Sequence, residues 1–491
     1  MNFQIMEGEV KSKDVLVRDE GNILIMSVVI VSLLVATGMG YMKWASDEKW
    51  DSEYERATIQ AYFVAQTGLI ERGLTFLRTR EPADLPQGSV NLLPGSVDGV
   101  GVHFKNMVSR VAGADGNLFQ RTDSYDLYST GQVMFTNHQM GNDGPRFIPV
   151  ERVATMRARL RSFANYMYLT DVEDTEYGEI IWFWTPDTLY GRTHSNDFIG
   201  LKYSPTFYGP VSTSMGEFIY NQPGQIHFEY PPVFNAPPVN FPKTAKSVRA
   251  NAQPFVTDGH GRLMTWIRLE GDGGYHIFQY PLGGVRAESV YSSGPPPNWQ
   301  AIFVDGQVEI EGTLTGQLTI GSSQDMFLID DVRYTAANRL TGDFNEEDPS
   351  VGIMGLVSEG DIIIRDNYRN GKENGINVGG ADWNRHSIVI TAGMVALGSS
   401  FTFEHQNDDW EGYQGPTPDE RGWIYLKGAV TQQRRGYVHR SNHTGTGYGK
   451  AYRYDFRFDR RPPPYYMEAL DENGHGLFDI ISWGEQTPVR H

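Results

Sequence analysis

The apolar positions near the start of the chain form one unbroken run. Residues 23–41 are nineteen consecutive residues without a charge, mostly Ile, Leu, Val and Met. At ~1.5 Å of rise per residue, a helix of this length just crosses the ~30 Å apolar core of a bilayer. A cleaved secretory signal would have a shorter apolar core followed by a small-residue cleavage site, which is not seen here. We therefore expect a single-pass membrane anchor.

The pattern changes after this run but shows no helix breaker. Apolar residues recur at close to a 3.6-residue period, which is typical of an amphipathic helix. They are Tyr54, Ala57, Ile59, Ala61, Phe63, Val64, Leu69, Ile70, Leu74, Phe76 and Leu77. The first proline after the apolar run is Pro82. The sequence therefore predicts one continuous helix over residues 22–80, with a transmembrane first half and an amphipathic second half.

The remaining residues alternate with a period near two and contain many turn residues. In 83–165 the alternation predicts a small antiparallel sheet. From 166 onward the apolar runs are short; those at 307–310, 317–320 and 326–329 recur every nine or ten residues. This spacing fits a parallel β-helix or an all-β sandwich, and the glycines that close the turns favour the β-helix. The proline-rich stretch 220–244 is expected to be a surface loop, because proline lacks the donor that a central strand needs.

Composition narrows the function classes. The 491 residues carry a formal net charge of −18, and we find no basic face, so nucleic-acid binding is disfavoured. The chain has no cysteine, which excludes disulfides, thiolate catalysis and cysteine-based zinc sites. The 54 glycines and 26 prolines indicate many turns, in agreement with a mostly β, α+β fold.

The head of the chain carries a family resemblance. A charged leader ending at Gly21, an apolar segment, and a helix containing A-Y-F-V-A-Q-T-G-L-I-E-R-G (61–73) resemble the N-terminal domain of PilX-type minor pilins. The resemblance implies that a prepilin peptidase cuts between Gly21 and Asn22, and that the helix then packs among other pilin-like subunits in a type IV pilus or pseudopilus. Asn22 stands where pilins usually have Phe or Met, and Met26 where major pilins have Glu. These departures favour a minor or tip subunit.

Segments of the body resemble the C-terminal portion of bacterial proteins that have a PilX-like N-terminal domain. They are H-S-N-D-F-I (194–199), F-Y-G-P-V-S-T-S (207–214), G-L-V-S-E-G-D-I-I-I (355–364), I-Y-L-K-G-A-V-T-Q-Q-R-R-G (424–436) and Y-R-Y-D-F-R-F-D-R-R-P-P-P-Y-Y (452–466). The resemblance implies a β-solenoid-like body without an assigned catalytic activity.

Three groups of residues suggest catalysis or metal binding. His194-Ser195 with Asp197 has the residue types of a nucleophilic site, but the spacing matches no nucleophile elbow, so polar turn contacts are favoured. The pair Asp330-Asp331 is of the kind that β-helix polysaccharide enzymes use, although a solvated turn is the simpler interpretation.

The third group is a candidate calcium loop. Asp471, Asn473 and Asp479 place oxygens at the spacing of a calcium-binding loop, but His475 stands where an acidic ligand is usual, and Ser482 where a Glu is usual. An Asx-rich turn is the simpler interpretation. No other cofactor is expected.

A pair of arginines and two groups of aromatic residues are further candidates for binding surfaces. The two arginines in Gln432–Arg435 are expected to pair with carboxylates such as Asp455 or Asp459. The aromatic residues at 182–184 and 452–458 could stack against sugars, but alternation favours a place in the core.

These patterns predict a leader (1–21), a pilin-like helix (22–82), an antiparallel sheet (83–165) and a β-solenoid-like body (166–491). The expected function is that of a non-enzymatic pilin-like subunit, held in the inner membrane and then assembled into a surface or periplasmic filament, whose body serves assembly or adhesion. Two alternatives remain: a membrane-anchored β-helix enzyme that degrades polysaccharide, and a static single-pass binding protein.

Overall fold

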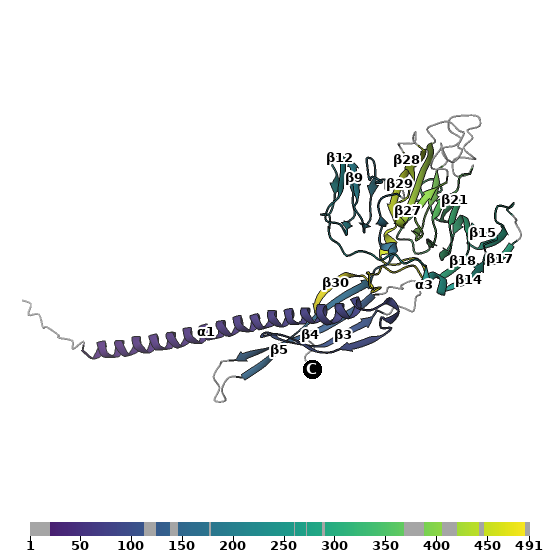
Figure 1. Cartoon of the computed structure of the whole chain (residues 1–491). Coiled ribbons are helices and arrows are strands. Elements are labelled where there is room, and N and C mark those ends of the chain that lie inside the picture. Colours follow the sequence, from purple (N-terminus) through teal and green to yellow (C-terminus); the bar gives the residue numbers. More distant parts are fainter. Residues whose placement is uncertain are drawn as a thin grey trace, which may run out of the picture.

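Figure 1 shows a long helix, a small sheet alongside the second half of that helix, and a large β body beyond the end of the helix. The computed structural model describes residues 20–111, 124–137, 146–175, 178–259, 261–271, 273–286, 290–367, 387–404, 420–440 and 446–486. The fold is α+β and mostly β, as the sequence predicts.

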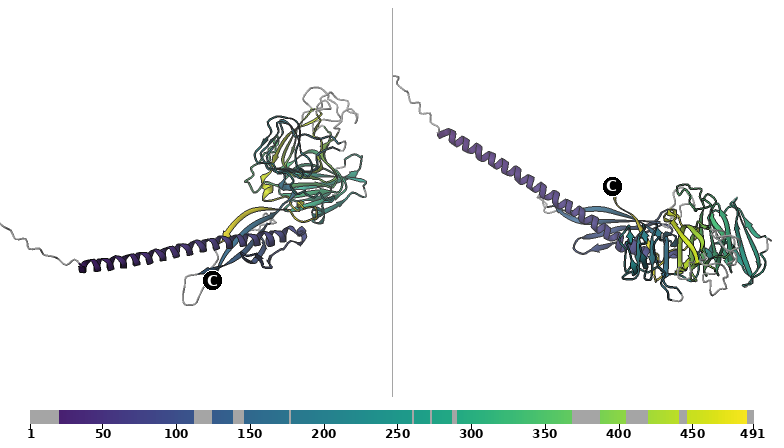
Figure 2. Two further views of the ribbon diagram at one scale, coloured as in Figure 1. Left: turned by 60° about the vertical axis from the view of Figure 1, so that its left-hand side comes forward. Right: turned by 90° about the horizontal axis from the view of Figure 1, so that it is seen from above.

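The predicted continuous helix is confirmed. It comprises α1 (Glu20–Gly68), a π-helical turn (Leu69–Leu74) and α2 (Thr75–Arg78), which follow one another directly. Its first half projects from the rest of the protein, and its second half lies along the sheet (Figure 2). The side chain of Thr75 donates a hydrogen bond to the Ile70 carbonyl at 3.0 Å, one residue further back than in an α-helix, which accommodates the wider π turn.

The small sheet is antiparallel, in the order β1-β3-β4-β5-β30, and β2 also pairs with β3. Its strands are β1 (Ser89–Leu92), β2 (Gly95–Val97), β3 (Gly101–Arg110), β4 (Ser124–Asn137), β5 (Arg146–Leu160) and β30 (Phe478–Gln486). The last strand differs from the expectation that residues 166–491 form one body. β30 leaves the body and pairs with β5 in the sheet, where Phe478 packs into the core beside Tyr125. The chain therefore enters and leaves the body at the same sheet edge.

Small residues allow the helix to lie very close to this sheet. Ala61 and Ala65 on α1 are fully buried. A Cβ at Gly131 on β4 would lie 2.1 Å from the Ala61 carbonyl oxygen and 2.4 Å from the Ala65 nitrogen. No side chain fits into that space, so the backbone contact requires glycine on the sheet and alanine on the helix.

The large body is a parallel β-solenoid with two principal stacks of strands. The first stack runs β14 (Ala252–Thr257), β18 (Gln300–Asp305), β20 (Gln317–Ser322), β22 (Ile353–Ser358), β25 (Gly393–Ala396), β27 (Glu420–Arg434), β6 (Tyr168–Val172), β8 (Thr193–Ser195), β11 (Val211–Thr213). The second contains β15 (Leu263–Leu269), β19 (Val308–Leu314), β21 (Met326–Tyr334), β23 (Ile362–Ile364), β24 (Ile388–Ile390), β26 (Phe401–Phe403), β27 again and β29 (Thr446–Tyr454).

The remaining strands of the body either extend the second stack or form small sheets of their own. β16 (Tyr275–Pro281) and β17 (Val290–Gly294) continue β15 as antiparallel strands, and β28 (His439–Arg440) pairs antiparallel with β29. The parallel strands β7 (Thr188–Leu189), β10 (Thr206–Phe207) and β13 (His227–Phe228) form a separate small sheet, and β9 (Gly200–Tyr203) pairs with β12 (Ile219–Pro223). The short helix α3 (Lys246–Ala250) precedes β14.

The order of the coils is not the order of the chain. β6 enters the middle of the first stack, and β8 and β11 extend it to one end. The chain then crosses to the opposite end at β14 and winds back coil by coil until β27 pairs with β6. Successive coils bury Leu318, Leu356 and Val395 completely. Gly312 allows a close approach between coils, because a Cβ there would lie 2.0 Å from the Leu269 carbonyl oxygen.

The proline-rich stretch is more ordered than predicted. Its first nine residues contribute to β12 and β13, which pair in parallel with β9 and β10. Pro223 is the last residue of β12, and this strand pairs only with β9, so the missing donor costs no ladder hydrogen bond. The rest of the stretch carries the chain toward β14.

Candidate functional site

The first half of the helix carries exposed apolar side chains on every side. Every large apolar side chain from Ile23 to Val35 is at least 49% exposed. By length and composition, the helix that continues to Arg78 can cross a membrane. The hydroxyls of Ser27 and Thr37 donate to the Leu24 and Leu33 carbonyls at 2.9 and 2.8 Å, so neither needs a partner outside the helix.

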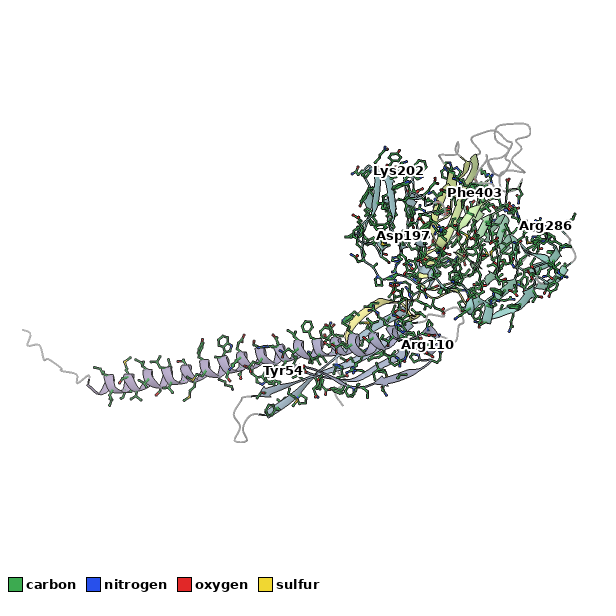
Figure 3. The ribbon with its side chains drawn as sticks, viewed as in Figure 1. Tyr54, Arg110, Asp197, Lys202, Arg286 and Phe403 are labelled. Carbon is green, nitrogen blue, oxygen red and sulfur yellow. The ribbon has the colours of Figure 1, made fainter. Side chains whose placement is uncertain are left out.

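The second half of the helix has two different faces. Trp50 and Tyr54 stack on one another and meet the ring of Phe135 edge-on, with centroids 5.6 and 5.9 Å from that ring. Figure 3 labels Tyr54 on the part of the helix that lies along the sheet. This face of the helix therefore packs on the sheet.

The other face remains open. Ile59, Phe63 and Ile70 are 56%, 58% and 49% exposed. Their spacing of four and seven residues places them in one row. This row, which we call the outer stripe, lies beyond the length that a bilayer covers and is separated from the apolar segment by polar and charged residues at 46–56.

The predicted processing residues lie at the start of the helix. α1 begins at Glu20, so the backbone of Gly21 and Asn22 is helical; their side chains lie outside the described residues. Further along, a Cβ at Gly38 or Gly40 would meet nothing within 4 Å.

The three predicted calcium ligands do not converge on one site. Asp471 closes its own turn, because its Oδ1 accepts the backbone N–H groups of Asn473 and His475 at 2.9 Å each. Asp479 is engaged elsewhere by two arginines. Among the described residues no group of three or more His, Asp or Glu side chains could hold a metal ion. Calcium binding here remains a prediction that would require Asp479 to leave its partners.

Asp479 instead joins the sheet to the solenoid. Its carboxylate accepts from Arg161, which follows β5, at 2.6 Å and from Arg192, which precedes β8, at 3.2 Å. Arg161 also donates to the Tyr166 hydroxyl at 2.7 Å. Burial alone would raise the pKa of Asp479, but the hydrogen bond and charge of Arg161, with the charge of Arg192, hold that pKa below its ordinary value. We call Asp479, Arg161 and Arg192 the junction cluster.

The residues that suggested a nucleophile are not arranged as one. His194 Nδ1 lies 2.8 Å from the Ser212 hydroxyl and its Nε2 lies 3.1 Å from Asn196 Oδ1. Ser195, its neighbour on β8, accepts from the Thr170 hydroxyl at 3.0 Å. Burial lowers the pKa of His194 to about 4, so it is neutral near pH 7. These contacts link neighbouring coils.

The carboxylate pair on β21 also has structural partners. Asp331 accepts the Val389 N–H at 2.8 Å, and Asp330 accepts the Asp331 N–H at 2.8 Å. Burial raises the pKa of Asp331 to about 6, with a smaller contribution from the charge of Asp330. Such a pKa suits acid–base chemistry, but the contact to Val389 gives the side chain a role between strands.

The arginines of 432–435 pair with carboxylates, as expected, but with different ones. Arg435 donates to Glu173 at 2.7 Å, and Arg434 pairs with Asp174. Both carboxylates follow β6, which lies beside β27. Sequence could not identify these partners, because they lie about 260 residues away along the chain.

The aromatic rows are largely core, as alternation predicts. Tyr452, Tyr454 and Phe458 are buried, whereas Phe456 is 51% exposed because β29 ends at Tyr454 and a short turn follows. Phe183 is buried, but Trp182 and Trp184 on either side of it are only half-buried.

Comparison with solved structures finds a similarity to the competence-associated pilin ComZ from Thermus thermophilus. The identity is 11%, the alignment covers 88% of this chain and 98% of that chain, and the TM-score is 0.25. A TM-score this low does not establish a common fold. No protein-family model and no curated protein sequence matches the chain.

Proposed function

We propose that this chain is a non-enzymatic, pilin-like subunit of a type IV pilus or pseudopilus, held in the inner membrane by its helix before assembly. The helix then packs among the helices of other pilin-like subunits. The body is displayed on the filament, for assembly or adhesion. The size of the solenoid, together with Asn22 and Met26, favours a PilX-like minor or tip subunit over a major one.

The observation that carries the proposal is that the two halves of one helix have different surroundings. Its described length from Ile23 to Arg78 is 56 residues, or roughly 84 Å at ~1.5 Å per residue. The first half is apolar all round, the second half is fixed to a sheet, and the solenoid lies at the far end. Such a subunit can exchange lipid for neighbouring helices without disturbing its folded body.

The outer stripe separates this proposal from that of a static anchor. An anchor needs apolar side chains only within the bilayer. Ile59, Phe63 and Ile70 lie beyond that length and are exposed in the isolated chain. A row of exposed apolar residues on a helix outside the bilayer is typical of a surface that other protein covers.

The test is the fate of the full chain in cells. We expect mass spectrometry to find a mature N-terminus at Asn22 and the protein to be present in sheared or extracted filaments. Gly21→Ala should leave the N-terminus at Met1 and keep the chain in the membrane fraction, whereas Gly8→Ala in the same leader should change neither. An unprocessed chain that never enters filaments would support the static anchor instead. Polysaccharide turnover lost on Asp331→Asn would support the enzyme.

A further inference from the structure

The solenoid contains a cavity that the proposed function does not use. It measures about 420 Å³, within the roughly 300–1,000 Å³ range of small-ligand sites. Most of its lining comes from three stretches far apart in sequence: 179–189, 432–440 and 450–452. Tyr168, Lys202 and Phe401 complete it. It therefore lies where β6, β7 and β9 meet β27 and β29. Figure 3 labels Lys202 on this side of the body.

Aromatic rings form much of the wall. Trp182 and Trp184 are half-buried, so part of each indole is available to a ligand, while Phe183 between them faces the core. The guanidinium carbon of Arg435 lies 3.7 Å from the centroid of the Phe183 ring and fixes that side of the wall. Indole faces offer flat apolar contact and an N–H at the edge.

The charged groups of the wall are largely neutralised by one another. Asp187 accepts from Lys450 Nζ at 2.8 Å and from the Trp184 backbone N–H at 3.2 Å. Arg435 donates to Glu173 at 2.7 Å, and both side chains are 3% exposed. The Tyr437 hydroxyl donates to Glu179. These pairs fix donors and acceptors at the cavity wall, which also carries Lys202 and Arg440.

One buried hydroxyl in the wall has no partner among the described residues. Tyr452 is 9% exposed, and its hydroxyl makes no hydrogen bond within that part of the chain. Burial raises its pKa well above the ordinary value, so the hydroxyl stays neutral and can both donate and accept. Tyr168 shows the contrast, since its hydroxyl accepts from Gln432 at 2.7 Å. A buried polar atom without a partner is costly, and a ligand that displaces the atoms now covering this hydroxyl would satisfy it.

We propose that this cavity binds a saccharide of one or two rings. A sugar ring has a C–H face that packs on indole and an edge of hydroxyls that both donate and accept. Trp182 and Trp184 supply the first kind of contact; Asp187, Lys450 and Tyr452 supply the second. A purely apolar ligand would leave the Tyr452 hydroxyl without a partner, and a simple anion would gain little from the indoles. The inference concerns the body alone and does not depend on assembly into a filament.

The experiment uses the full chain in lipid nanodiscs, because detergents with sugar headgroups would compete. Tryptophan fluorescence and saturation-transfer NMR would be recorded with a panel of glucose, galactose, N-acetylglucosamine, N-acetylgalactosamine, glucuronic acid, N-acetylneuraminic acid and their common disaccharides. We expect at least one to bind saturably. Trp184→Ala should weaken that binding about tenfold or more, and Tyr452→Phe by about three- to tenfold. Trp423→Ala is the matched control: this indole is 45% exposed on β27 outside the cavity, and its loss should leave the affinity unchanged.

Tyr452→Phe also keeps the inference testable if Trp184→Ala does not fold, because it removes only the hydroxyl. The saccharide site is refuted if nothing in the panel binds, or if the Tyr452 and Trp184 variants bind as tightly as the parent. Binding of a short peptide or an oligonucleotide in place of every sugar would also refute it. None of these results bears on filament assembly, which is measured separately.

Discussion

The two β regions of this molecule hide their apolar faces in different ways. The antiparallel sheet is covered by the long helix, and its core consists of side chains from both elements, such as Leu69 and Leu77 with Leu127 and Met156. The solenoid encloses its own core, because each coil covers the next, and side chains such as Ile320 and Leu356 are fully buried within it. The sheet therefore depends on the helix, and the solenoid does not.

This difference separates the two tasks of the proposed subunit. Whatever moves the helix, whether lipid or neighbouring helices, acts directly on the sheet. It reaches the solenoid through the chain crossings and the junction cluster. A body built in this way can keep a binding cavity intact while the helix changes its surroundings.

The largest effect is expected where the helix and sheet backbones touch. Gly131→Leu would place a side chain where the Cβ alone lies 2.1 Å from the Ala61 carbonyl oxygen, so the helix must move away. We expect a loss of about 3 kcal/mol or more in the stability of the sheet. Hydrogen exchange should show lost protection in β3, β4 and β5, while β18, β20 and β22 keep theirs.

Gly88→Leu is the matched control for that substitution. Gly88 precedes β1, and a Cβ there meets nothing within 4 Å. Its replacement should leave both regions unchanged. Equal loss of protection in the solenoid of Gly131→Leu would show that the two regions unfold as one unit, and the contrast drawn above would then be wrong.

The junction cluster is the place to measure how the regions are coupled. Asp479→Ala leaves Arg161 and Arg192 without their shared carboxylate, whose side chain is 18% exposed. Because the cluster is only partly buried, we expect a loss of about 2–3 kcal/mol, below that of a fully buried pair. Thermal unfolding would measure the loss, and hydrogen exchange should place it at β5 and β30.

The control is an exposed pair within the same sheet. Arg157 and Asp126 lie 2.6 Å apart, and their side chains are 46% and 25% exposed. Asp126→Ala should cost no more than about 1 kcal/mol. If it costs as much as Asp479→Ala, the junction cluster has no special role in joining the two regions.

Sequence patterns predicted local structure well in both regions and long-range pairing in neither. The runs at 317–320 and 326–329 correspond to β20 and β21, because the spacing of apolar residues and turns is a local property. The pairing of β27 with β6 and of β30 with β5 joins segments more than 250 residues apart, and no period records it. The cavity cannot be predicted from the sequence for the same reason. Its aromatic residues at 182–184 and Tyr452 form recognisable patterns, but their meeting depends on the order of the coils.

A smaller effect, confined to the solenoid, comes from Asp331. Its pKa of about 6 in the folded protein is above the ordinary value, so the folded state holds this proton more tightly than the unfolded state does. The resulting stability is fully present below about pH 4 and is lost as the pH rises through about 6. Allowing for partial exposure, the loss is on the order of 1–2 kcal/mol.

Asp331→Asn removes that titration and can still accept the Val389 N–H. We therefore expect the variant to lose less stability than the parent between pH 4 and pH 7, as measured by urea unfolding at each pH. Sheet variants such as Asp126→Ala should keep the slope of the parent. Parallel curves for Asp331→Asn and the parent would contradict the assignment.

The smallest effect on stability should come from the outer stripe, and it also tests the proposed function. Phe63 is 58% exposed, whereas its neighbour Val64 is 1% exposed and packs toward the sheet. Phe63→Ser should change the free energy of unfolding by no more than about 0.5 kcal/mol, and Val64→Ser should lower it by about 2 kcal/mol or more. In cells we expect the opposite ranking for incorporation into filaments, counted per folded molecule: Phe63→Ser should reduce it more than Val64→Ser. Phe63→Ser would deplete the subunit from sheared filaments, because the stripe lies where a neighbouring helix is expected to pack. Normal incorporation of Phe63→Ser would mean that this face of the helix stays uncovered and that assembly depends on the membrane half alone.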